Sequence, residues 1–192
     1  MYNFFAYMAR MKLIKRWSLM KSVDEENIAE HSLQVAQIAH ALALIKNKYF
    51  GGALNPDRLT TLALYHETGE VLTGDLPTPI KYYNPKINVA YKEIESIACE
   101  KLLTMLPEPL KEDYEPLIIP SEDSYEHILV KAADKISAYL KCIEEGKAGN
   151  KEFAKAEKSL KKAVESYFDY EEVKFFCENF VPPFKKTLDE LE

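Results

Sequence analysis

The sequence is poor in cysteine and glycine, and it has no long apolar run. Its three cysteines, Cys99, Cys142 and Cys177, are odd in number and far apart, and no C-x-x-C pair occurs. This pattern argues against a disulfide framework and against a zinc site built from thiolates, and it fits a reducing compartment. No stretch approaches the roughly 18 consecutive apolar residues of a membrane span, and the first residues show no export signal. We therefore expect a cytoplasmic protein with no membrane partner.

Basic residues are also in the minority. The 192 residues include 25 Lys plus Arg and 31 Asp plus Glu, which gives a formal net charge of −6. An acidic chain lacks the positive field that non-specific binding to DNA or RNA requires. We therefore expect no nucleic-acid polymer as a partner, while a local basic pocket for a small phosphate ligand stays open.

Helical spacing is what the sequence does show. Apolar residues recur every three or four positions, which is typical of amphipathic helices, and apolar and polar residues nowhere alternate over the length of a strand. In the segment 87–105, this spacing puts Ile94, Ile97, Ala98 and Leu102 on one side. The expected helices cover residues 30–44, 56–66, 87–105, 124–146, a lysine-rich stretch after Asn150, and 170–180. With no repeat or linker to divide it, the chain is predicted to be one all-α domain over residues 1–192, an irregular helical bundle.

Two histidines stand beside acids. His31 follows Glu30 at the start of a predicted helix, and His66 is followed by Glu67 and then by Glu70. Imidazole nitrogens together with carboxylate oxygens suit a divalent metal ion such as Mn, Co, Fe or Zn. On a helix His66 and Glu70 face the same way, so Glu70 is well placed to take a proton from water beside a metal ligand.

A third acid, Asp134, lies deep in the helix predicted over residues 124–146. A buried carboxylate is costly unless it is paired or bound to a metal ion. Simpler interpretations stay open at this point, because His31 alone could be a hydrogen-bonded structural residue. Asp134 could likewise only pair with Lys131 or Lys135.

Two other metal motifs are excluded. His66-Glu67-x-x-Glu70 matches the first part of the zinc-protease motif His-Glu-x-x-His, but position 70 is Glu rather than His. The paired Glu-x-x-His motifs of a carboxylate-bridged di-iron bundle are missing too. His40 and His127 are expected to be structural or to lie at the surface.

Two further segments have the composition of a ligand site. Two prolines and a glycine predict an irregular loop over residues 72–80, which can present the Asp75 carboxylate and the Thr78 hydroxyl beside the metal. Arg16 offers donors for a phosphate, and Trp17, the only Trp of the chain, offers a flat wall for a sugar or base. Taken alone, the loop can also be a simple connection that interrupts a helix. Likewise, Trp17 can lie at the edge of the core while the Arg16 charge is solvated.

Together these residues resemble the HD superfamily of metal-dependent phosphohydrolases, and more narrowly the bacterial 5'-deoxynucleotidases of the YfbR type. The similarity spans nearly the whole chain. It is carried by Phe4-Phe5, Arg16-Trp17, residues 29–35 (AEHSLQV), Tyr65-His66, residues 70–79 (EVLTGDLPTP), residues 131–134 (KAAD) and residues 180–182 (FVP).

The resemblance implies a helical fold, a homodimer, and removal of the 5'-phosphate from deoxyribonucleoside 5'-monophosphates. It implies one divalent metal ion of the Co, Mn or Zn class, with ligands at His31, His66, Glu67 and Asp134. Glu70 takes the place of the catalytic carboxylate and Arg16 that of the residue that orients the phosphate, while Trp17 crowds the sugar 2' position. The substrate contacts that it implies are Arg16, Trp17, His31, Glu67, Asp75, Leu76, Pro77, Thr78 and Asp134.

Glu67 departs from the family signature, in which aspartate follows the second histidine. The extra methylene moves the carboxylate outward by about 1.5 Å if the backbone stays put, whereas metal–oxygen distances tolerate only about ±0.2 Å. We therefore expect weaker metal binding or a changed metal preference. The departure also motivates an alternative, a nucleotide-binding sensor with an impaired metal site, and another HD nucleotide phosphohydrolase is a further alternative. The intact set of His31, His66, Glu70 and Asp134 argues against the sensor.

Overall fold

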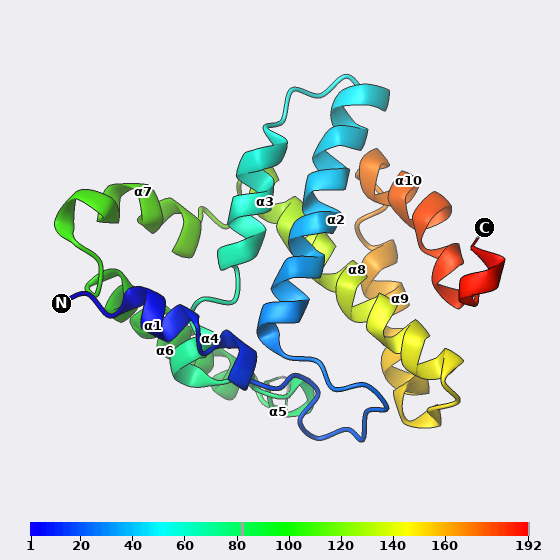
Figure 1. Cartoon of the computed structure of the whole chain (residues 1–192), viewed down its shortest axis with the longest axis horizontal. Helices are drawn as coiled ribbons and strands as arrows, with labels where there is room; N and C mark the ends of the chain where they lie inside the picture. The colour runs from blue at the N-terminus through cyan, green and yellow to red at the C-terminus, as the bar shows by residue number, and fades with distance from the viewer. Residues whose placement is uncertain (82, 192) are drawn as a thin grey trace.

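All the regular secondary-structure elements of the described residues are helices. The computed structural model describes residues 1–81 and 83–191, and this part of the chain contains no strand (Figure 1). The all-α prediction is therefore confirmed. The longer helices are α2 (Ile28–Tyr49), α3 (Pro56–Tyr65), α6 (Pro85–Leu103), α7 (Glu108–Ile118), α8 (Tyr125–Lys147), α9 (Ala154–Glu165) and α10 (Glu171–Phe180). The short ones are α1 (Phe4–Met8), α4 (Glu70–Thr73), α5 (Thr78–Lys81) and the 3₁₀ turns η1 (Met11–Leu13), η2 (Lys151–Phe153), η3 (Pro182–Lys185) and η4 (Leu188–Glu190).

Side-chain caps fix where the main helices begin. The Asn27 side chain accepts hydrogen bonds from the backbone of Ala29 and Glu30, and Glu30 returns a bond to the Asn27 backbone, so α2 begins with a capping box. Asn55 caps α3, and Ser124 caps α8. The predicted starts of α3 and α8 therefore agree with the structure to within one residue, while α2 begins two residues earlier than predicted.

The core lies around α2, which packs against α3, α8 and α10 (Figure 1). Val35 and Leu42 of α2, Leu59 of α3 and Leu129 and Ile136 of α8 are completely buried there. Burying a side chain of this size contributes about 1.5–3 kcal/mol. Three helices that carry predicted site residues are thus fixed rigidly against one another.

The edge of the bundle holds the main differences from the predicted helices. Leu106-Pro107 ends α6 as expected, but α7 then begins at Glu108-Pro109, because proline is well tolerated in the first turn of a helix. The short helices α1, α4 and α5 are also absent from the prediction, since four or five residues carry no readable apolar period.

Helix α6 has apolar residues outside the core. Ala98 and Leu102 are buried, but Ile94 is 52% exposed and Ile97 is 63% exposed. The four residues lie on one side of α6, as expected, but the fold covers this side only at Ala98 and Leu102. Helix α6 lies at the edge of the fold, where α4, α5 and α7 cover only part of its circumference (Figure 1).

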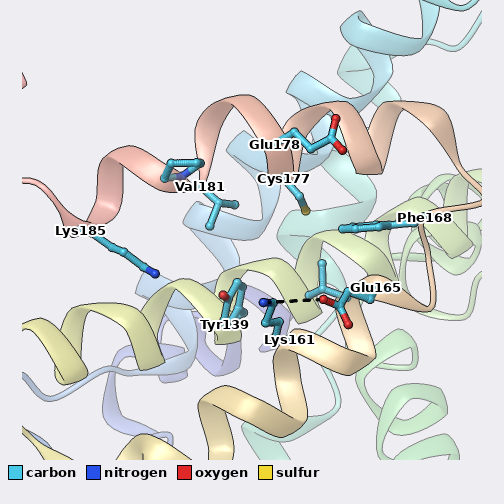
Figure 2. A pocket seen from close by; sticks show the side chains of 10 residues that line it. Tyr139, Lys161, Glu165, Phe168, Cys177, Glu178, Val181 and Lys185 are labelled. Carbon is cyan, nitrogen blue, oxygen red and sulfur yellow. Dashed lines mark ion pairs between the residues drawn. The ribbon is translucent and has the colours of Figure 1, made fainter.

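A cavity of about 270 Å³ opens between α8, α9, α10 and η3 (Figure 2). Its wall is mainly apolar and includes Tyr139, Phe168 and Val181, with Lys161 and Glu165 paired at 3.9 Å beside them. None of the predicted site residues lines this cavity. The predicted chemistry therefore belongs to another part of the fold.

The surface and the cysteines behave as expected. The lysines of α9 are exposed, and Cys99, Cys142 and Cys177 are free thiols. Within residues 1–81 and 83–191, every helix is too short or too polar to cross a membrane.

Candidate metal centre

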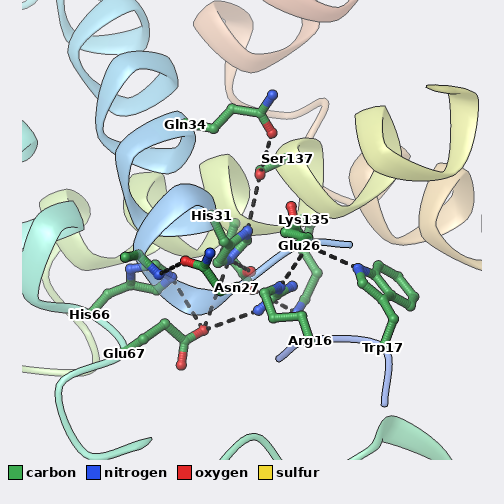
Figure 3. A network of polar contacts seen from close by, with 12 residues as sticks. Arg16, Trp17, Glu26, Asn27, His31, Gln34, His66, Glu67, Lys135 and Ser137 are labelled. Carbon is green, nitrogen blue, oxygen red and sulfur yellow. Dashed lines mark hydrogen bonds and ion pairs between the residues drawn. The ribbon is translucent and has the colours of Figure 1, made fainter. Parts of the chain in front are cut away.

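The four predicted metal ligands converge from separate parts of the chain. His31 lies on α2, His66 is the C-cap of α3, Glu67 follows it in a turn, and Asp134 lies on α8. One donor atom of each residue lies within 4.8 Å of the donor atoms of the other three. Figure 3 shows His31, His66 and Glu67 of this cluster pointing toward one another. His31 is completely buried, and the other three are partly buried. The helical core therefore assembles two imidazoles and two carboxylates at one point.

The hydrogen bonds of His31 determine which ring nitrogen carries a proton. The Ser137 hydroxyl donates to Gln34 Oε1 at 2.6 Å, so its oxygen accepts from His31 Nδ1 at 3.1 Å. Burial first, and then the Arg16 charge, lowers the pKa of His31 and favours the neutral ring. The Nε2 lone pair then faces Asp134 Oδ1 at 3.0 Å. Two acceptors at this distance repel each other unless a proton or a metal ion lies between them.

His66 is oriented in the same way. Its Nδ1 donates to the Ala63 carbonyl oxygen at 2.6 Å, which leaves Nε2 as the free ligand atom of the neutral ring. Among the described residues this buried Nε2 has no hydrogen-bond partner, and Glu67 Oε1 lies 3.3 Å away. Burial lowers the pKa of His66, but the Glu67 carboxylate outweighs burial and raises it. His66 Nε2 therefore attracts a cation, either a proton or a metal ion.

Both carboxylates of the cluster are ionised at neutral pH. Burial raises the pKa of Glu67, but His66 and Arg16 outweigh burial and hold it well below the usual range. Burial likewise opposes ionisation of Asp134, but Lys135, whose Nζ is 2.9 Å from Oδ2, and His31 lower its pKa. Two carboxylates and two imidazoles form a donor set that suits Mn, Co or Zn, so these residues fit a divalent metal ion.

The longer side chain of Glu67 still reaches the centre. Besides His66, its Oε1 lies 3.9 Å from His31 Nε2 and 3.7 Å from Arg16 Nη1. The carboxylate thus stands between the imidazole ligands and the guanidinium group (Figure 3). An additional methylene therefore does not remove this acid from the cluster.

Glu70 lies beside the centre but not on one helix with His66, because α3 ends at Tyr65 and α4 begins at Glu70. Four-residue turns connect the two helices, with Thr68 N donating to Tyr65 O and Glu70 N to Glu67 O, both at 3.1 Å. Glu70 is 6% exposed, and its Oε2 has no hydrogen-bond partner among the described residues. Burial, and then the Glu67 carboxylate, raises the pKa of Glu70 to about 11. The group is thus a buried carboxyl that holds a proton at neutral pH.

Arg16 lies beside the centre on the segment over residues 14–27, which joins η1 to α2, and Trp17 is the next residue of this segment. Arg16 Nη1 faces Glu67, as described above. Glu26 Oε2 accepts from Arg16 Nε at 3.0 Å and from Trp17 Nε1 at 2.9 Å (Figure 3). The sequence analysis missed Glu26, because nothing in the acidic run Asp24-Glu25-Glu26 distinguishes the inward carboxylate from its neighbours.

The predicted irregular loop is shorter than expected. Leu72 and Thr73 belong to α4, and Thr78 begins α5, so the expected irregular loop over residues 72–80 is wrong at both ends, and only residues 74–77 are irregular. A proline in the first turn starts α5 instead of preventing it. Of the predicted contact residues Asp75, Leu76 and Pro77 are half-buried, and Thr78 is exposed.

Asp75 is a residue of this loop whose pKa depends on the charges of the centre. Burial raises its pKa, the Arg16 charge opposes this rise, and the Glu67 charge adds to it. The loop is fixed by the Tyr91 hydroxyl, which donates to Gly74 O at 3.0 Å, and by the Lys81–Glu95 ion pair at 3.2 Å. His40 and His127 do not join the four donor atoms, which agrees with the structural or surface role expected for them.

Comparison with known proteins supplies an independent line of evidence. The family model described as 5'-deoxynucleotidase YfbR-like matches residues 3–184. A 5'-deoxynucleotidase from Vibrio cholerae serotype O1 is 57% identical over 190 residues, which is 98% of this chain and 97% of that protein. A 5'-deoxynucleotidase from Erwinia tasmaniensis is 54% identical over 190 residues, 98% of this chain and 96% of that one.

Solved structures share the fold. An HD-domain phosphohydrolase from Listeria innocua superimposes with a TM-score of 0.85 at 22% sequence identity, over 95% of this chain and 88% of that one. An HD phosphohydrolase from cyanophage S-2L, bound to dA and one catalytic Zn²⁺ ion, gives a TM-score of 0.64 at 20% identity, over 92% of this chain and 95% of that one. At these identities the likeness establishes the helical arrangement.

Proposed function

Because this chain belongs to the 5'-deoxynucleotidase YfbR-like family, we propose that it hydrolyses deoxyribonucleoside 5'-monophosphates to deoxyribonucleosides and phosphate. The observation that carries the proposal is the convergence of four metal-ligand donor atoms within 4.8 Å, with Arg16 and a buried, protonated Glu70 beside them. A metal site, a phosphate-binding cation and a proton-transfer group are the parts that hydrolysis of a phosphate monoester requires.

One divalent ion of the Co, Mn or Zn class would be held by His31, His66, Glu67 and Asp134. When bound, such an ion reduces the negative charge of the phosphate and acidifies a nearby water. The buried His66 Nε2, which has no hydrogen-bond partner among the described residues, and the opposed acceptors of His31 and Asp134 support this assignment. The zinc ion bound to the structurally similar cyanophage phosphohydrolase also supports this assignment. Because His31, Glu67 and Asp134 surround the reacting group, they also contact the substrate.

Arg16 binds the non-bridging phosphate oxygens. Its Nε is already used by Glu26, so the two terminal nitrogens are left to form a bidentate pair with the phosphate. Neutralising the phosphate charge in this way lowers the repulsion that otherwise keeps a nucleophile from the phosphorus atom. The terminal nitrogens lie on the side of the centre, because Nη1 is 3.7 Å from Glu67.

Glu70 moves the protons of the reaction. The oxygen of a water molecule bonds to the phosphorus atom, the bond from phosphorus to the 5'-oxygen breaks, and the leaving oxygen must gain a proton. A carboxyl group whose pKa is raised to about 11 keeps a proton that it can give to the 5'-oxygen. The resulting carboxylate then takes the proton that the attacking water loses, so the net reaction restores Glu70.

Trp17 and the loop over residues 75–78 hold the nucleoside. The Trp17 ring would crowd the 2' position, where a ribose hydroxyl clashes and loses its hydrogen bonds to water. That penalty of about 1–3 kcal/mol corresponds to roughly a 5- to 150-fold preference for deoxyribose. Asp75, Leu76, Pro77 and Thr78 would contact the sugar and base.

The protein is further proposed to be a cytoplasmic homodimer in which residues 1–192 form one phosphohydrolase domain. Metal ligands from both halves of the chain support the single domain. The exposed stripe Ile87, Ala90, Ile94 and Ile97 of α6 supports dimerisation, because apolar residues at alternating steps of three and four form a helix-pairing seam. Light scattering should give twice the mass of one chain for the native protein and one chain mass for Ile94→Glu; a native monomer would contradict the dimer.

Phosphate release from dAMP and AMP tests the function. Metal-stripped protein is supplemented in turn with Co²⁺, Mn²⁺, Zn²⁺ and Mg²⁺, and we expect metal-dependent hydrolysis of dAMP well above that of AMP. If no phosphate is released with any metal while dAMP still binds, the proposed hydrolytic activity is contradicted and a nucleotide sensor is favoured. Release of triphosphate from a deoxynucleoside triphosphate would instead indicate another HD phosphohydrolase.

A further inference from the structure

We propose that Glu26 is a positioning residue that holds the phosphate-binding Arg16 and the sugar-facing Trp17 in one arrangement, and thereby sets the selectivity for deoxyribose. The selectivity part of this inference rests on the proposed function. Among the described residues, the Glu26 carboxylate bonds to Arg16 and Trp17 and is not one of the four clustered donor groups, so it would act only through these two neighbours.

A single carboxylate oxygen joins the two side chains. Glu26 Oε2 accepts from Arg16 Nε at 3.0 Å and from Trp17 Nε1 at 2.9 Å, and Glu26 and Arg16 side chains are only 12% and 11% exposed. A hydrogen bond to an ionised carboxylate is about twice as strong as one between neutral groups. In Figure 3 the carboxylate lies between the guanidinium group and the indole. Displacing one of the two side chains therefore disturbs the bond to the other.

The bond to Arg16 decides which of its nitrogens faces the substrate. Guanidinium has one N–H on Nε and four on its terminal nitrogens. Glu26 takes the single Nε–H, and the backbone strengthens this pairing because Arg16 N donates to Glu26 O at 2.9 Å. The terminal nitrogen Nη1 then lies 3.7 Å from Glu67 Oε1 of the clustered donor residues. Without Glu26 the guanidinium can rotate, and its bidentate grip on a phosphate is lost.

The bond to Trp17 holds a strained backbone. Trp17 has φ = 58°, the left-handed region that bulky residues rarely adopt, and it is the only non-glycine residue with positive φ among the described residues. Such a conformation persists only where the surroundings fix it firmly. Glu26 holds the indole at Nε1, and Phe153 packs against the ring at a centroid distance of 5.2 Å. Removing the carboxylate leaves the indole with the Phe153 contact but without its hydrogen bond, so the side chain restrains the strained backbone less firmly.

The chain offers a matched control one residue away. Glu25 has the same charge, but its side chain is 72% exposed and pairs with Lys15 at 2.7 Å, away from Arg16 and Trp17. An exposed pair of this kind contributes little to stability. Glu25→Gln therefore removes the same charge from the same segment without touching the two positioned side chains.

The experiment compares native protein, Glu26→Gln, Glu26→Ala and Glu25→Gln. Glu26→Gln should raise the KM for dAMP about tenfold or more, with a smaller change in kcat, and should lower the ratio of kcat/KM for dAMP to that for AMP severalfold. Because Phe has no indole N–H, adding Glu26→Gln to Trp17→Phe should raise KM further through Arg16 but leave the ratio unchanged. Glu25→Gln should match the native protein in both quantities.

A second readout needs no turnover. Trp17 is the only Trp of the chain, so fluorescence quenching by acrylamide reports on this residue alone. We expect stronger quenching in Glu26→Ala and Glu26→Gln than in native protein or Glu25→Gln. If both Glu26 variants keep the native ratio and the native quenching while only the thermal midpoint falls, Glu26 is merely structural and the inference is overturned. If native protein fails to hydrolyse dAMP, the proposed function fails, and the quenching comparison still decides whether Glu26 positions Trp17.

Discussion

The metal centre and the segment over residues 14–27 hold functional side chains by different means. Ligands of the centre come from α2, the end of α3 and α8, whose other faces lie in the main core. Arg16 and Trp17 lie on a segment without regular helix, and polar contacts fix it to the rest of the fold. Apolar packing thus positions the four proposed metal ligands, whereas hydrogen bonds position Arg16 and Trp17, the two residues proposed to meet the phosphate and the sugar.

Buried Glu145 of α8 is the main anchor of that segment. Its carboxylate accepts from the backbone of Val23 at 2.9 Å and of Asp24 at 3.2 Å. It also accepts from Asn150 Nδ2 at 2.7 Å and from Lys141 Nζ at 2.6 Å, and only 1% of the residue is exposed. These bonds hold the pKa of Glu145 down at about 2, against the effect of burial. We therefore expect changes at the metal centre to reduce metal binding, and changes that loosen the segment over residues 14–27 to reduce substrate binding.

The largest effect is expected from removing a ligand of the helical centre. Asp134→Asn should weaken Co²⁺ binding by more than about 100-fold and abolish dAMP hydrolysis at ordinary metal concentrations, because a neutral amide is a poor ligand beside two imidazoles. Equilibrium dialysis of Co²⁺ measures the loss. Asp123→Asn, at an exposed acid just before the same helix, is the control and should bind like native protein.

Glu70→Gln separates chemistry from binding at the centre. The amide cannot exchange protons, so kcat for dAMP should fall about 10²- to 10⁴-fold. Calorimetry should show Co²⁺ and dAMP still bound, because Glu70 is not one of the four clustered ligands. Near-native turnover of this variant would show that another group transfers the proton.

Glu145→Gln tests the anchor of the irregular segment. Weakening bonds to a buried carboxylate should cost about 1–3 kcal/mol of unfolding free energy, raise the KM for dAMP and leave Co²⁺ affinity unchanged. The folded pKa of about 2 lies below the value for an unfolded glutamate, so this stabilisation is complete above pH 4.5 and is lost as the pH falls toward 2. The urea midpoint should therefore fall less between pH 5 and pH 3 in the variant than in native protein. If the urea midpoint falls equally in native protein and in Glu145→Gln, the ionised Glu145 carboxylate does not stabilise the fold in this way.

The smallest effect is expected at Glu67. Shortening it by Glu67→Asp should change Co²⁺ affinity only severalfold, since Glu67 Oε1 already lies among the ligand atoms. The same change should withdraw the carboxylate from Arg16 Nη1, now 3.7 Å away. Titrations of native protein and variant with Co²⁺ and Zn²⁺ measure the effect, and indistinguishable affinities for both metals would contradict any role of the extra methylene in metal preference.

The difference between these two regions also explains which structural features could be predicted from the sequence. Apolar spacing and capping residues such as Asn55 and Ser124 are local signals, so α2, α3 and α8 were predictable, and His31, His66 and Asp134 were recognisable as unusual polar residues on them or at their ends. The inward direction of Glu26, the positive φ of Trp17 and the anchoring by Glu145 depend on contacts between residues far apart in the chain. No local pattern records such contacts. The exposure of Ile94 and Ile97 could not be predicted for the same reason, because only the packing shows how much of that side of α6 is covered.

The most direct test of the account joins metal binding to hydrolysis in the same samples. Metal-stripped protein is titrated with Co²⁺, and bound Co²⁺ and phosphate released from dAMP are measured at each point. The account predicts that the rate rises in proportion to bound Co²⁺ and saturates at one ion per chain. Full hydrolysis without bound metal, or binding of one Co²⁺ per chain with no hydrolysis, would contradict it.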